Sequence, residues 1–556
     1  MRGHGSGRFL RFIAGGMAPA VVTPAYPGPG SGTVKPRGRT TATAAGHDPI
    51  RWRRAIGAVL LVAGSLIDVA RAGTVAVDLR SEYDVRIWSA RAAHSVGDVN
   101  GDGIPDLYVA GPWGRWVIFG QRPMSRRFKL RTFDGPGFEI LGRREWAANE
   151  DVAAAGDVNG DGLDDIIFGR GDADNNGRSR SGSAYVVFGK TDSDPVDLDS
   201  FDRSLQGDAG FRIDGADAGD AAGESVAGLG DVDGDGLADV VVGAPFAGAA
   251  YAVFGKTDTR PVDLRSYERD DTAELQLDLG MAGTRGFRIS TKAPRRWDQE
   301  GLSVGGAGDV NGDESPDVIV GIRGKPKTSG KAYVVFGKKD GSSVNTREAG
   351  DWGFKIEGFY RRSHTGFKVT AADDVNGDGL DDVLVSAPVL NALEASSVYV
   401  VFGKTDTQTV DLAEVAAGSC CGFRIHGLSR HVEFFGPPLT GLMVDGIGDI
   451  NGDGLDDVVV DAPQASFNGR YLSGSVFVVY GKKGFRTIEL EQIGNRGFRI
   501  DGAGNYDEVG QVGGLSDFGG DGIPDILMAA EGAPGEGDRL GRDAVAGAAY
   551  ILYGRR

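Results

Sequence analysis

The sequence contains only two cysteines among 556 residues, and these are neighbours, Cys420 and Cys421. A framework of disulfides is therefore excluded. Two unpaired thiols are the expected state of the pair, and a strained vicinal disulfide is the alternative in an exported protein. Apolar residues at helical spacing are nearly absent, which favours an all-β chain. Histidine is also scarce, and none of the last four of the six, His94, His364, His426 and His431, stands in a spacing typical of metal ligands or of a catalytic triad.

Long hydrophobic runs are missing except near the amino terminus. A basic cluster (residues 51–54) precedes a mostly apolar run (residues 55–67), and Ala70-Arg71-Ala72 follows as a small-x-small cleavage site. This order is typical of a signal peptide, and the run is too short to span a bilayer; an uncleaved anchor is the alternative. We assign residues 1–50 to a leader outside the fold, 51–72 to a signal peptide and 73–556 to the mature domain.

The charge of the chain is strongly acidic. The formal net charge is −18, and because residues 1–72 hold ten Lys or Arg and two Asp, residues 73–556 carry −26. Such a surface repels nucleic acid and anionic membranes. We therefore expect no nucleic-acid partner. The signal-peptide-like segment predicts a secreted, cell-surface or periplasmic protein, and the lack of later apolar runs predicts no membrane span in the mature chain.

What the sequence has in abundance is an aspartate-rich loop followed by a short β-branched strand. The loop occurs seven times, as in DVNGDGLDDIIF, and glycine, which permits tight turns, reaches 91 residues. The loops begin at Asp98, Asp157, Asp231, Asp309, Asp374, Asp449 and Asp517. Because units of about 60–80 residues cannot bury their own apolar faces, we predict a seven-bladed β-propeller of four-stranded blades.

Repeat 3 shows the expected strands of one blade. They are residues 223–230, 240–245, 249–255 and 286–290, each bounded by Gly or Pro. The aromatic-Gly end of the third strand recurs seven times, but the Gly-Phe start of the fourth recurs only six times. We expect Val85-Arg86-Ile87 to supply the missing strand, so that the N-terminal strand closes the ring and removal of residues 73–90 destabilises it.

Each loop alternates oxygen ligands in the way that calcium requires. Positions 1, 3, 5 and 9 carry oxygen side chains, and position 7 offers a backbone carbonyl; Ca²⁺ takes six to eight hard oxygens in flexible geometry. The candidate ligands are Asp98, Asn100, Asp102, Ile104 and Asp106; Asp157, Asn159, Asp161, Leu163 and Asp165; Asp231, Asp233, Asp235, Leu237 and Asp239; Asp309, Asn311, Asp313 and Asp317; Asp374, Asn376, Asp378, Leu380 and Asp382; Asp449, Asn451, Asp453, Leu455 and Asp457; and Asp517, Asp521 and Asp525.

Calcium loops have two alternatives. An EF-hand needs a bidentate Glu at position 12 and a following helix, but position 12 is Val109 or Phe168 within an expected strand. Metal-free hydrogen-bonded turns are the second alternative, and seven loops in one register disfavour it. Two loops depart from the pattern, with Glu314 at the turn glycine of repeat 4 and Gly519 at position 3 of repeat 7. Of up to seven Ca²⁺ sites, five are well formed, and those two are expected to be weaker or empty.

These units resemble FG-GAP repeats, the blades of the seven-bladed propeller at the head of integrin α chains. The DxNxDGxxD loops carry the resemblance, together with the strand ends Ala244-Pro245 and Ala387-Pro388, and it covers about residues 75–556. It implies a calcium-binding adhesion or ligand-binding module whose calcium face lies away from the partner. In integrins only some blades carry these loops, so the resemblance implies fold and calcium more than signalling.

The loops on the other face pair arginines with aromatics, a combination that can hold anionic or sugar ligands. An alternative is that these arginines only decorate loops whose aromatics pack inward. The candidate ligand-binding residues are Trp113, Arg144, Trp146, Arg296, Trp297, Tyr360 and Arg361. The tripeptide Arg170-Gly171-Asp172, which many integrins recognise, is interpreted as a chance match.

Signals for an enzyme are poor. The stretch Gly301-Leu302-Ser303-Val304-Gly305 fits GxSxG, but a nucleophile elbow needs a strand–turn–helix and this segment is an expected first strand. We therefore predict an exported calcium-binding propeller, not an enzyme, with an extracellular protein or glycan as its partner. The alternatives are a polysaccharide-active lyase or hydrolase, or a structural envelope component.

Overall fold

The computed structural model describes residues 76–142, 151–201, 209–268, 286–291, 301–324, 328–348, 350–389, 395–428, 439–534 and 547–554. All the described residues belong to one compact unit. The expected leader and signal peptide, and four candidate ligand residues, lie outside the described residues: Arg144, Trp146, Arg296 and Trp297. Among the described residues, no helix has the length and apolarity that crossing a membrane requires.

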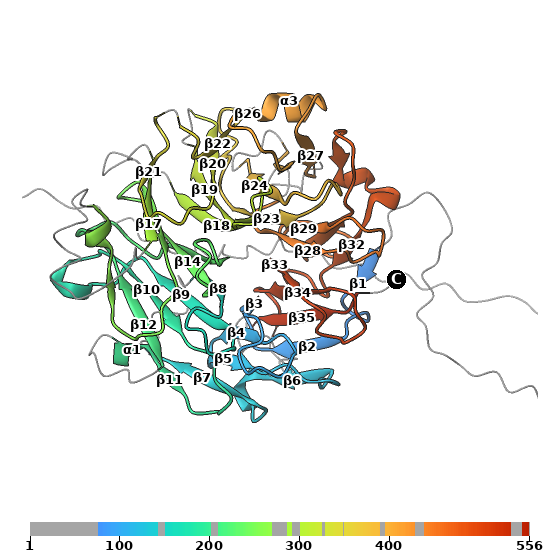
Figure 1. The fold of residues 1–556 in the computed structure, drawn as a ribbon. Helices are drawn as coiled ribbons and strands as arrows, with labels where there is room; N and C mark the ends of the chain where they lie inside the picture. The colour runs from blue at the N-terminus through green and yellow to red at the C-terminus, as the bar shows by residue number, and fades with distance from the viewer. Residues whose placement is uncertain are drawn as a thin grey trace, which may run out of the picture. The chain divides into compact units, whose positions relative to one another are not determined.

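The described unit consists of seven sheets, which confirms the seven-bladed β-propeller (Figure 1). The first strands of successive blades lie beside one another around the centre. From the first strand outward, blade 1 is β3 (Ala92–Ser95), β4 (Leu107–Gly111), β5 (Gly114–Ile118), β7 (Gly137–Leu141) and β11 (Val196–Asp197). Blade 2 is β8 (Asp151–Gly156), β9 (Asp165–Arg170), β10 (Ser183–Val187), β12 (Gly210–Asp214) and β16 (Val262–Asp263).

The next three blades follow the same order. Blade 3 is β13 (Ser225–Gly230), β14 (Asp239–Ala244), β15 (Ala249–Val253), β17 (Gly286–Ser290) and β21 (Val344–Asn345). Blade 4 is β18 (Leu302–Gly308), β19 (Asp317–Arg323), β20 (Gly330–Val335), β22 (Gly353–Glu357) and β26 (Val410–Asp411). Blade 5 is β23 (Val369–Asp373), β24 (Asp382–Ala387), β25 (Ser397–Val401), β27 (Gly422–His426) and β31 (Ile488–Glu489).

The last two blades combine segments from both ends of the chain. Blade 6 is β28 (Val444–Gly448), β29 (Asp457–Ala462), β30 (Ser475–Val479), β32 (Gly497–Asp501) and β1 (Ala76–Asp78). Blade 7 is β33 (Val509–Leu515), β34 (Asp525–Ala530), β35 (Ala548–Leu552), β2 (Val85–Trp88) and β6 (Arg127–Lys129). The pairing of β2 with β35 is antiparallel, with Ile87 opposite Ala549. The segment expected to supply the fourth strand of blade 7 therefore takes that position.

The prediction of four strands per blade is wrong, because each sheet has five. The fifth is a strand of two or three residues that pairs parallel to the fourth, as Val196 does with Ile140. The fifth strand comes from the spacer between the third and fourth strands of the following blade. The outer edge of each blade is therefore formed by a short strand that its neighbour supplies. In sequence these strands read as spacer, since two residues are too few to show a period.

The apolar core lies between neighbouring sheets. One cluster joins Ile167 and Val186 of blade 2 to Val240 and Val242 of blade 3, and six further clusters are built from other neighbouring sheets in the same way. Each sheet therefore buries its apolar faces only by stacking on the next, as the repeat argument requires.

The two cysteines are joined to each other. Cys420 and Cys421 form a disulfide, which corrects the expectation of two unpaired thiols. They lie in the short connection between the helix α3 (Leu412–Ala417) and β27. The other α-helix of the described residues, α1 (Leu198–Phe201), likewise follows a fifth strand.

Candidate metal sites and the opposite face

The backbone of each loop is organised around its first aspartate. In loop 1, the N–H groups of Gly101 and Asp102 donate to Oδ1 of Asp98 at 2.8 and 3.0 Å, and that of Gly103 donates to Oδ2 at 2.7 Å. The same three bonds recur in the other six loops. Gly103 has a φ of +82°, which glycine adopts without strain. The loop is thus preformed by its own N–H donors.

The aspartate at position 9 is the buried member of each site. Asp106 is 0% exposed and accepts N–H groups from Val99 at 2.9 Å and from Gly120 at 2.7 Å. Its equivalents Asp165, Asp239, Asp317, Asp382, Asp457 and Asp525 are also 0% exposed and accept the glycine N–H that follows the third strand.

Burial raises the pKa of these position-9 carboxyls. The pKa rises to about 7 for Asp106, Asp239 and Asp457, to about 8 for Asp165, Asp317 and Asp382, and to about 6 for Asp525. The N–H donors favour the charged form, but they only partly offset the loss of hydration. A divalent cation beside each carboxylate would supply the missing stabilisation of its charge.

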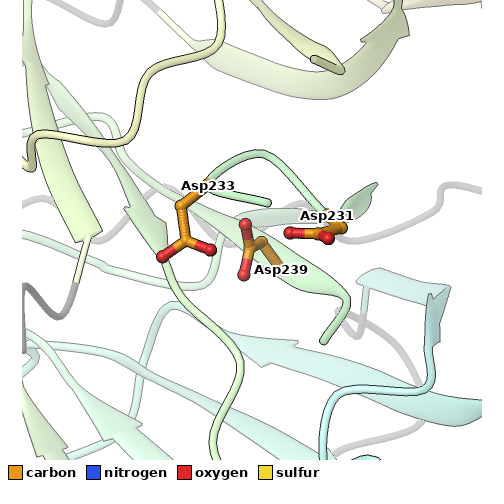
Figure 2. Close-up of side chains that lie close together, drawn as sticks. All are labelled: Asp231, Asp233 and Asp239. Carbon is orange, nitrogen blue, oxygen red and sulfur yellow. The ribbon is translucent and has the colours of Figure 1, made fainter. Parts of the chain in front are cut away.

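Loop 3 brings three carboxylates together (Figure 2). Asp231, Asp233 and Asp239 each place an oxygen within 4.8 Å of the others, a spacing that a single metal ion can bridge. Burial and the neighbouring Asp235 and Asp231 raise the pKa of Asp233. All donors are hard oxygens, so the set suits Ca²⁺ and not a soft metal.

Four of the five loops with asparagine at position 3 place its amide beside the buried carboxylate; in the fifth, Asn159 donates to Asp161 at 3.0 Å. Asn100 donates Nδ2–H to both carboxylate oxygens of Asp106 at 3.2 Å, and Asn311, Asn376 and Asn451 do the same to Asp317, Asp382 and Asp457. The amide therefore lies beside the buried carboxylate. Turning the amide by half a turn presents Oδ1, an oxygen ligand, at that place.

The two divergent loops behave differently. In loop 4, Glu314 adopts φ +67° and its N–H still donates to Asp309 at 2.8 Å, so the loop keeps its shape without the glycine. In loop 7, Gly519 leaves position 3 without a side chain, and its N–H donates to Asp525 at 2.7 Å. The expectation that both sites are weaker remains a prediction.

An arginine side chain from another blade contacts loop 7. The Arg122 guanidinium, from the blade 1 spacer, donates to the carbonyls of Asp517 and Phe518 and lies 3.9 Å from the Asp517 carboxylate. Burial opposes ionisation of Asp517, but three backbone N–H donors and Arg122 outweigh it, and its pKa lies below the usual value. Part of the positive charge that loop 7 needs is therefore supplied by the protein.

Neighbouring loops are linked to one another. The N–H of Asp98 donates to the carboxylate of Asp164, in loop 2, at 2.8 Å, and the N–H of Asp164 returns to the Asp98 carbonyl at 3.1 Å. Asp381 and Asp456 make the same exchange with the loops that precede theirs. An ion bound at one of these loops would therefore lie beside a contact with the next blade.

The opposite end of the blades exposes aromatic side chains. Among the candidate ligand residues, Trp113 lies in the turn between β4 and β5 and is 54% exposed, and Tyr360, next to exposed Arg361, is 40% exposed. Sequence reasoning missed three more exposed aromatics, Phe246, Phe359 and Tyr506. Single aromatics in turns carry no periodic signal, so only their exposure identifies them.

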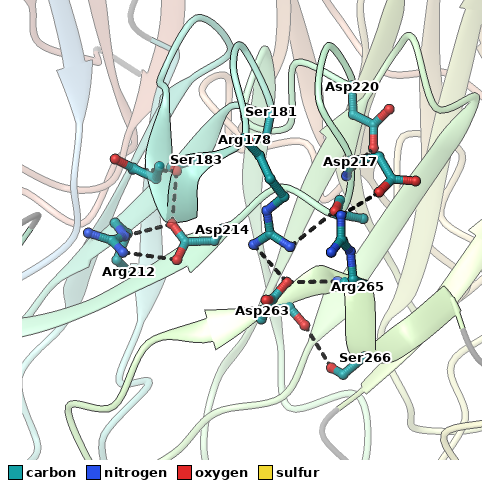
Figure 3. Close-up of polar contacts among 12 residues, drawn as sticks. Arg178, Ser181, Ser183, Arg212, Asp214, Asp217, Asp220, Asp263, Arg265 and Ser266 are labelled. Carbon is teal, nitrogen blue, oxygen red and sulfur yellow. Dashed lines mark hydrogen bonds and ion pairs between the residues drawn. The ribbon is translucent and has the colours of Figure 1, made fainter.

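Other arginines on this face are structural (Figure 3). Arg178 ion-pairs with Asp263 of the fifth strand β16 at 3.0 Å and donates to the Ala216 carbonyl at 3.1 Å. Arg470 makes the equivalent ion pair with Asp78 of β1 at 2.8 Å. Both arginines stand in the motif N-G-R-x-x-S-G-S, at residues 176–183 and 468–475. That shared motif is the signal from which these anchors could have been found.

Two motifs singled out in the sequence have structural explanations. Arg170 donates to Asp172 at 2.9 Å, so the charges of the Arg-Gly-Asp tripeptide are paired with each other. Ser303 lies in the first strand β18, and its hydroxyl accepts the N–H of Val369 from the next blade at 3.3 Å. Position 12 of loops 1 and 2 lies in β4 and β9, so neither loop is followed by the helix of an EF-hand.

Comparison with known proteins gives matches to one repeat type. Residues 98–168 match the FG-GAP-like repeat, and residues 222–259, 365–401 and 446–479 match the FG-GAP repeat. Integrin alpha pat-2 of Caenorhabditis elegans is 31% identical over 293 residues, which is 50% of this chain and 21% of that protein. Integrin alpha-2 of Mus musculus is 37% identical over 97 residues, or 17% of this chain and 7% of that protein.

A relative of another kind also matches. Phosphatidylinositol-glycan-specific phospholipase D of Dictyostelium discoideum is 24% identical over 236 residues, 40% of this chain and 24% of that protein. The chain thus covers less than a quarter of the length of each of these three relatives.

Proposed function

Since the chain is an FG-GAP repeat propeller like the heads of integrin alpha chains, we propose that it is an exported calcium-binding module for adhesion or ligand binding. The observation that carries the proposal is the repetition of one preformed oxygen loop in all seven blades, each with a fully buried aspartate at position 9. Export rests on the signal-like segment at residues 51–72.

Calcium would be held within each loop by positions 1, 3, 5 and 9 and by the position-7 carbonyl. When bound, the ion supplies positive charge to carboxylates that otherwise share a poorly hydrated site. The chain's own part is to orient these oxygens: backbone N–H groups hold Asp98, and the Ile104 N–H holds Oδ1 of Asp102 at 2.9 Å. Because the ion binds the folded loop, it stabilises the propeller by mass action.

The partner is proposed to bind on the face opposite the loops. There the exposed Trp113 and Tyr360, with Arg361, offer stacking and charge-assisted hydrogen bonds to a protein or glycan. Aromatics and arginine are the residue types enriched among binding hot spots. The predicted Arg144, Trp146, Arg296 and Trp297 belong to the same proposal.

A binding screen tests this proposal. The full chain is applied to a glycan array and to extracellular-matrix proteins, first unaltered and then as the double variant Trp113→Ala/Tyr360→Ala. Phe485→Ala, an exposed aromatic at the loop end of blade 6, is the matched control. Loss of binding in the double variant alone supports the proposal, and undiminished binding contradicts it.

An enzymatic function is the second candidate, because a phospholipase D is among the relatives. The described histidines offer it little support. His426 pairs with Glu489 at 2.7 Å, and burial lowers the pKa of His94 and of His364. We therefore favour binding over catalysis, and turnover of a polysaccharide or glycolipid panel would reverse that choice.

A further inference from the structure

The segment that follows the third strand of a blade lies against the aspartate loop of the preceding blade. In four blades, the N–H of the residue after the third-strand glycine donates to the position-2 carbonyl of that loop: Lys190 to Val99 at 2.8 Å, and Lys256, Lys404 and Lys482 to Val158, Val310 and Val375 at 2.9 Å each. The next residue along the chain is therefore held beside the loop by the backbone.

The residue at this second position after the glycine is basic in some blades and threonine in others. Blades 1, 4 and 6 carry Arg122, Lys339 and Lys483, whereas blades 2, 3 and 5 carry Thr191, Thr257 and Thr405. The residue of blade 7, Arg556, lies outside the described part of the chain. Loops 7, 3 and 5 thus have a basic neighbour, and loops 1, 2 and 4 have an uncharged one.

Lys339 reaches over loop 3. Its Nζ is 2.5 Å from the place that a Cβ would take on Gly234, at position 4 of the loop, and the N–H of that glycine donates to Asp231 at 2.6 Å. In loops 1, 2 and 4 a leucine of the next blade covers the corresponding glycine. Blade 4 has Ser315 in place of that leucine, and the lysine side chain covers the glycine instead.

Loop 3 also has an extra negative charge that a lysine can balance. Among the seven loops it alone has aspartate at position 3, so its ligand positions carry four carboxylates where those of loop 1 carry three. Three of them, Asp231, Asp233 and Asp239, have oxygens within 4.8 Å of one another (Figure 2). Burial raises the pKa of Asp233, and the charge of Lys339 is among the influences that oppose the rise. The ammonium group therefore interacts electrostatically with a candidate calcium ligand.

The other two basic residues occupy the same place over their loops. Nζ of Lys483 is 3.3 Å from the Cβ position of Gly377 in loop 5, and the N–H of Gly377 donates to Asp374 at 2.6 Å. In loop 7, Nε of Arg122 is 2.7 Å from the Cβ position of Gly520. Each of the three loops therefore has a positive charge from the next blade close to its first aspartate.

We propose that Lys339 sets the calcium affinity of loop 3, as Arg122 and Lys483 do for loops 7 and 5; the inference rests on the proposed calcium function. The fixed ammonium group repels an incoming Ca²⁺, and it partly neutralises the carboxylates when no ion is bound. Loop 3 therefore binds calcium more weakly than its four carboxylates alone would allow, and it loses less stability without the ion. Loops 1 and 2, which face threonine, lack this effect.

Calcium titration of the full chain against a chromophoric chelator at low ionic strength tests the proposal. Lys339→Met removes the charge but keeps a side chain of similar length over Gly234, and we expect one calcium-binding constant to rise about fivefold. Lys339→Arg keeps the charge and should leave every constant unchanged. The reverse change, Thr257→Lys beside loop 2, should lower one constant by a similar factor, with Thr257→Met as its control.

Two further readouts separate the charge of Lys339 from the shape of its side chain. The gain in calcium affinity of Lys339→Met should shrink as salt rises to 1 M, where the Debye length is about 3 Å. In excess chelator this variant should melt at a lower temperature than the unaltered chain, whereas in saturating calcium the two should melt at the same temperature.

Failure of this inference and failure of the proposed function give different results. Absence of calcium binding by the unaltered chain would overturn both. Calcium-binding constants that are the same in the unaltered chain and in Lys339→Met would overturn this inference alone. An equal gain in Lys339→Arg, or a gain in Lys339→Met that does not depend on salt, would likewise overturn it and leave the proposed function standing.

Discussion

On the face that carries the aspartate loops, all seven blades repeat the same backbone hydrogen bonds, whereas the described loops of the opposite face differ from blade to blade. The first face keeps its N–H donors to the position-1 aspartate even where Glu314 replaces glycine. The second places Trp113 in one turn, Tyr360 in another and a buried Arg470 in a third. We interpret the uniform loops as the part that stabilises the propeller, and the varied loops as the proposed site of partner binding.

The largest expected effect comes from Asp239→Ala in loop 3. The change removes a candidate ligand and leaves the buried N–H groups of Val232 and Gly255 without their acceptor. Two such losses cost about 1–3 kcal/mol each, before any calcium is counted. We expect denaturant unfolding to show a loss of about 4 kcal/mol and equilibrium dialysis to show one calcium fewer.

The control for that experiment is the matching change in the divergent loop. Asp525→Ala also removes an acceptor for two N–H groups, but loop 7 lacks a position-3 ligand. We expect a similar structural destabilisation with a smaller loss of bound calcium, or none. An equal loss of calcium from both variants would remove the distinction between complete and divergent loops.

The next largest effect is expected on the opposite face. It distinguishes the buried arginines that form structural ion pairs from the exposed ones. Arg470→Ala breaks the ion pair that fastens β1 to blade 6, where the arginine is 5% exposed. We expect a loss of about 2 kcal/mol in unfolding free energy, below the 3–5 kcal/mol of fully buried pairs because Asp78 is partly exposed. Arg361→Ala, on an exposed side chain, should change it by less than about 0.5 kcal/mol. Equal losses of unfolding free energy in the two variants would contradict this distinction between structural and exposed arginines.

A smaller effect is expected from pH. The pKa of Asp239 and of its equivalents is raised by burial, to about 7 for three of the seven, so the calcium-free protein gains stability from protonation and loses it as the pH rises through 7. Calcium competes with these protons, and we expect its apparent affinity to fall about tenfold, or ~1.4 kcal/mol, between pH 8 and pH 6. Titrations in buffers of different ionisation enthalpy should show proton release on binding. Affinity independent of pH would contradict a role for the position-9 carboxyls as ligands.

The smallest effect on stability is expected for the exposed aromatics of the proposed binding face. Their replacement should have the largest effect on partner binding. Trp113→Ala/Tyr360→Ala changes only exposed side chains, so the unfolding free energy should change by less than about 0.5 kcal/mol. A large loss of stability would show that these aromatics are part of the framework, and the contrast between the two faces would then fail.

The sequence could predict what is repeated and local. The loop spacing, the four strands of repeat 3 and the place of Val85–Trp88 in blade 7 follow from periodicity and from the recurrence of Gly-Phe. The fifth strands could not be predicted, because parallel pairs of two residues have no period of their own. Contacts between residues far apart in the sequence, such as that of Arg122 with loop 7, could not be predicted either. They depend on which segments the closed ring places side by side.

The most direct test of the account is thermal unfolding of the full chain with calcium and with excess chelator, together with a count of bound ions. We predict several calcium ions per chain, and a melting temperature that falls on chelation and returns when calcium is restored. An unchanged melting temperature in chelator, with no calcium bound before it was added, would contradict the claim that the seven aspartate loops hold the propeller through calcium.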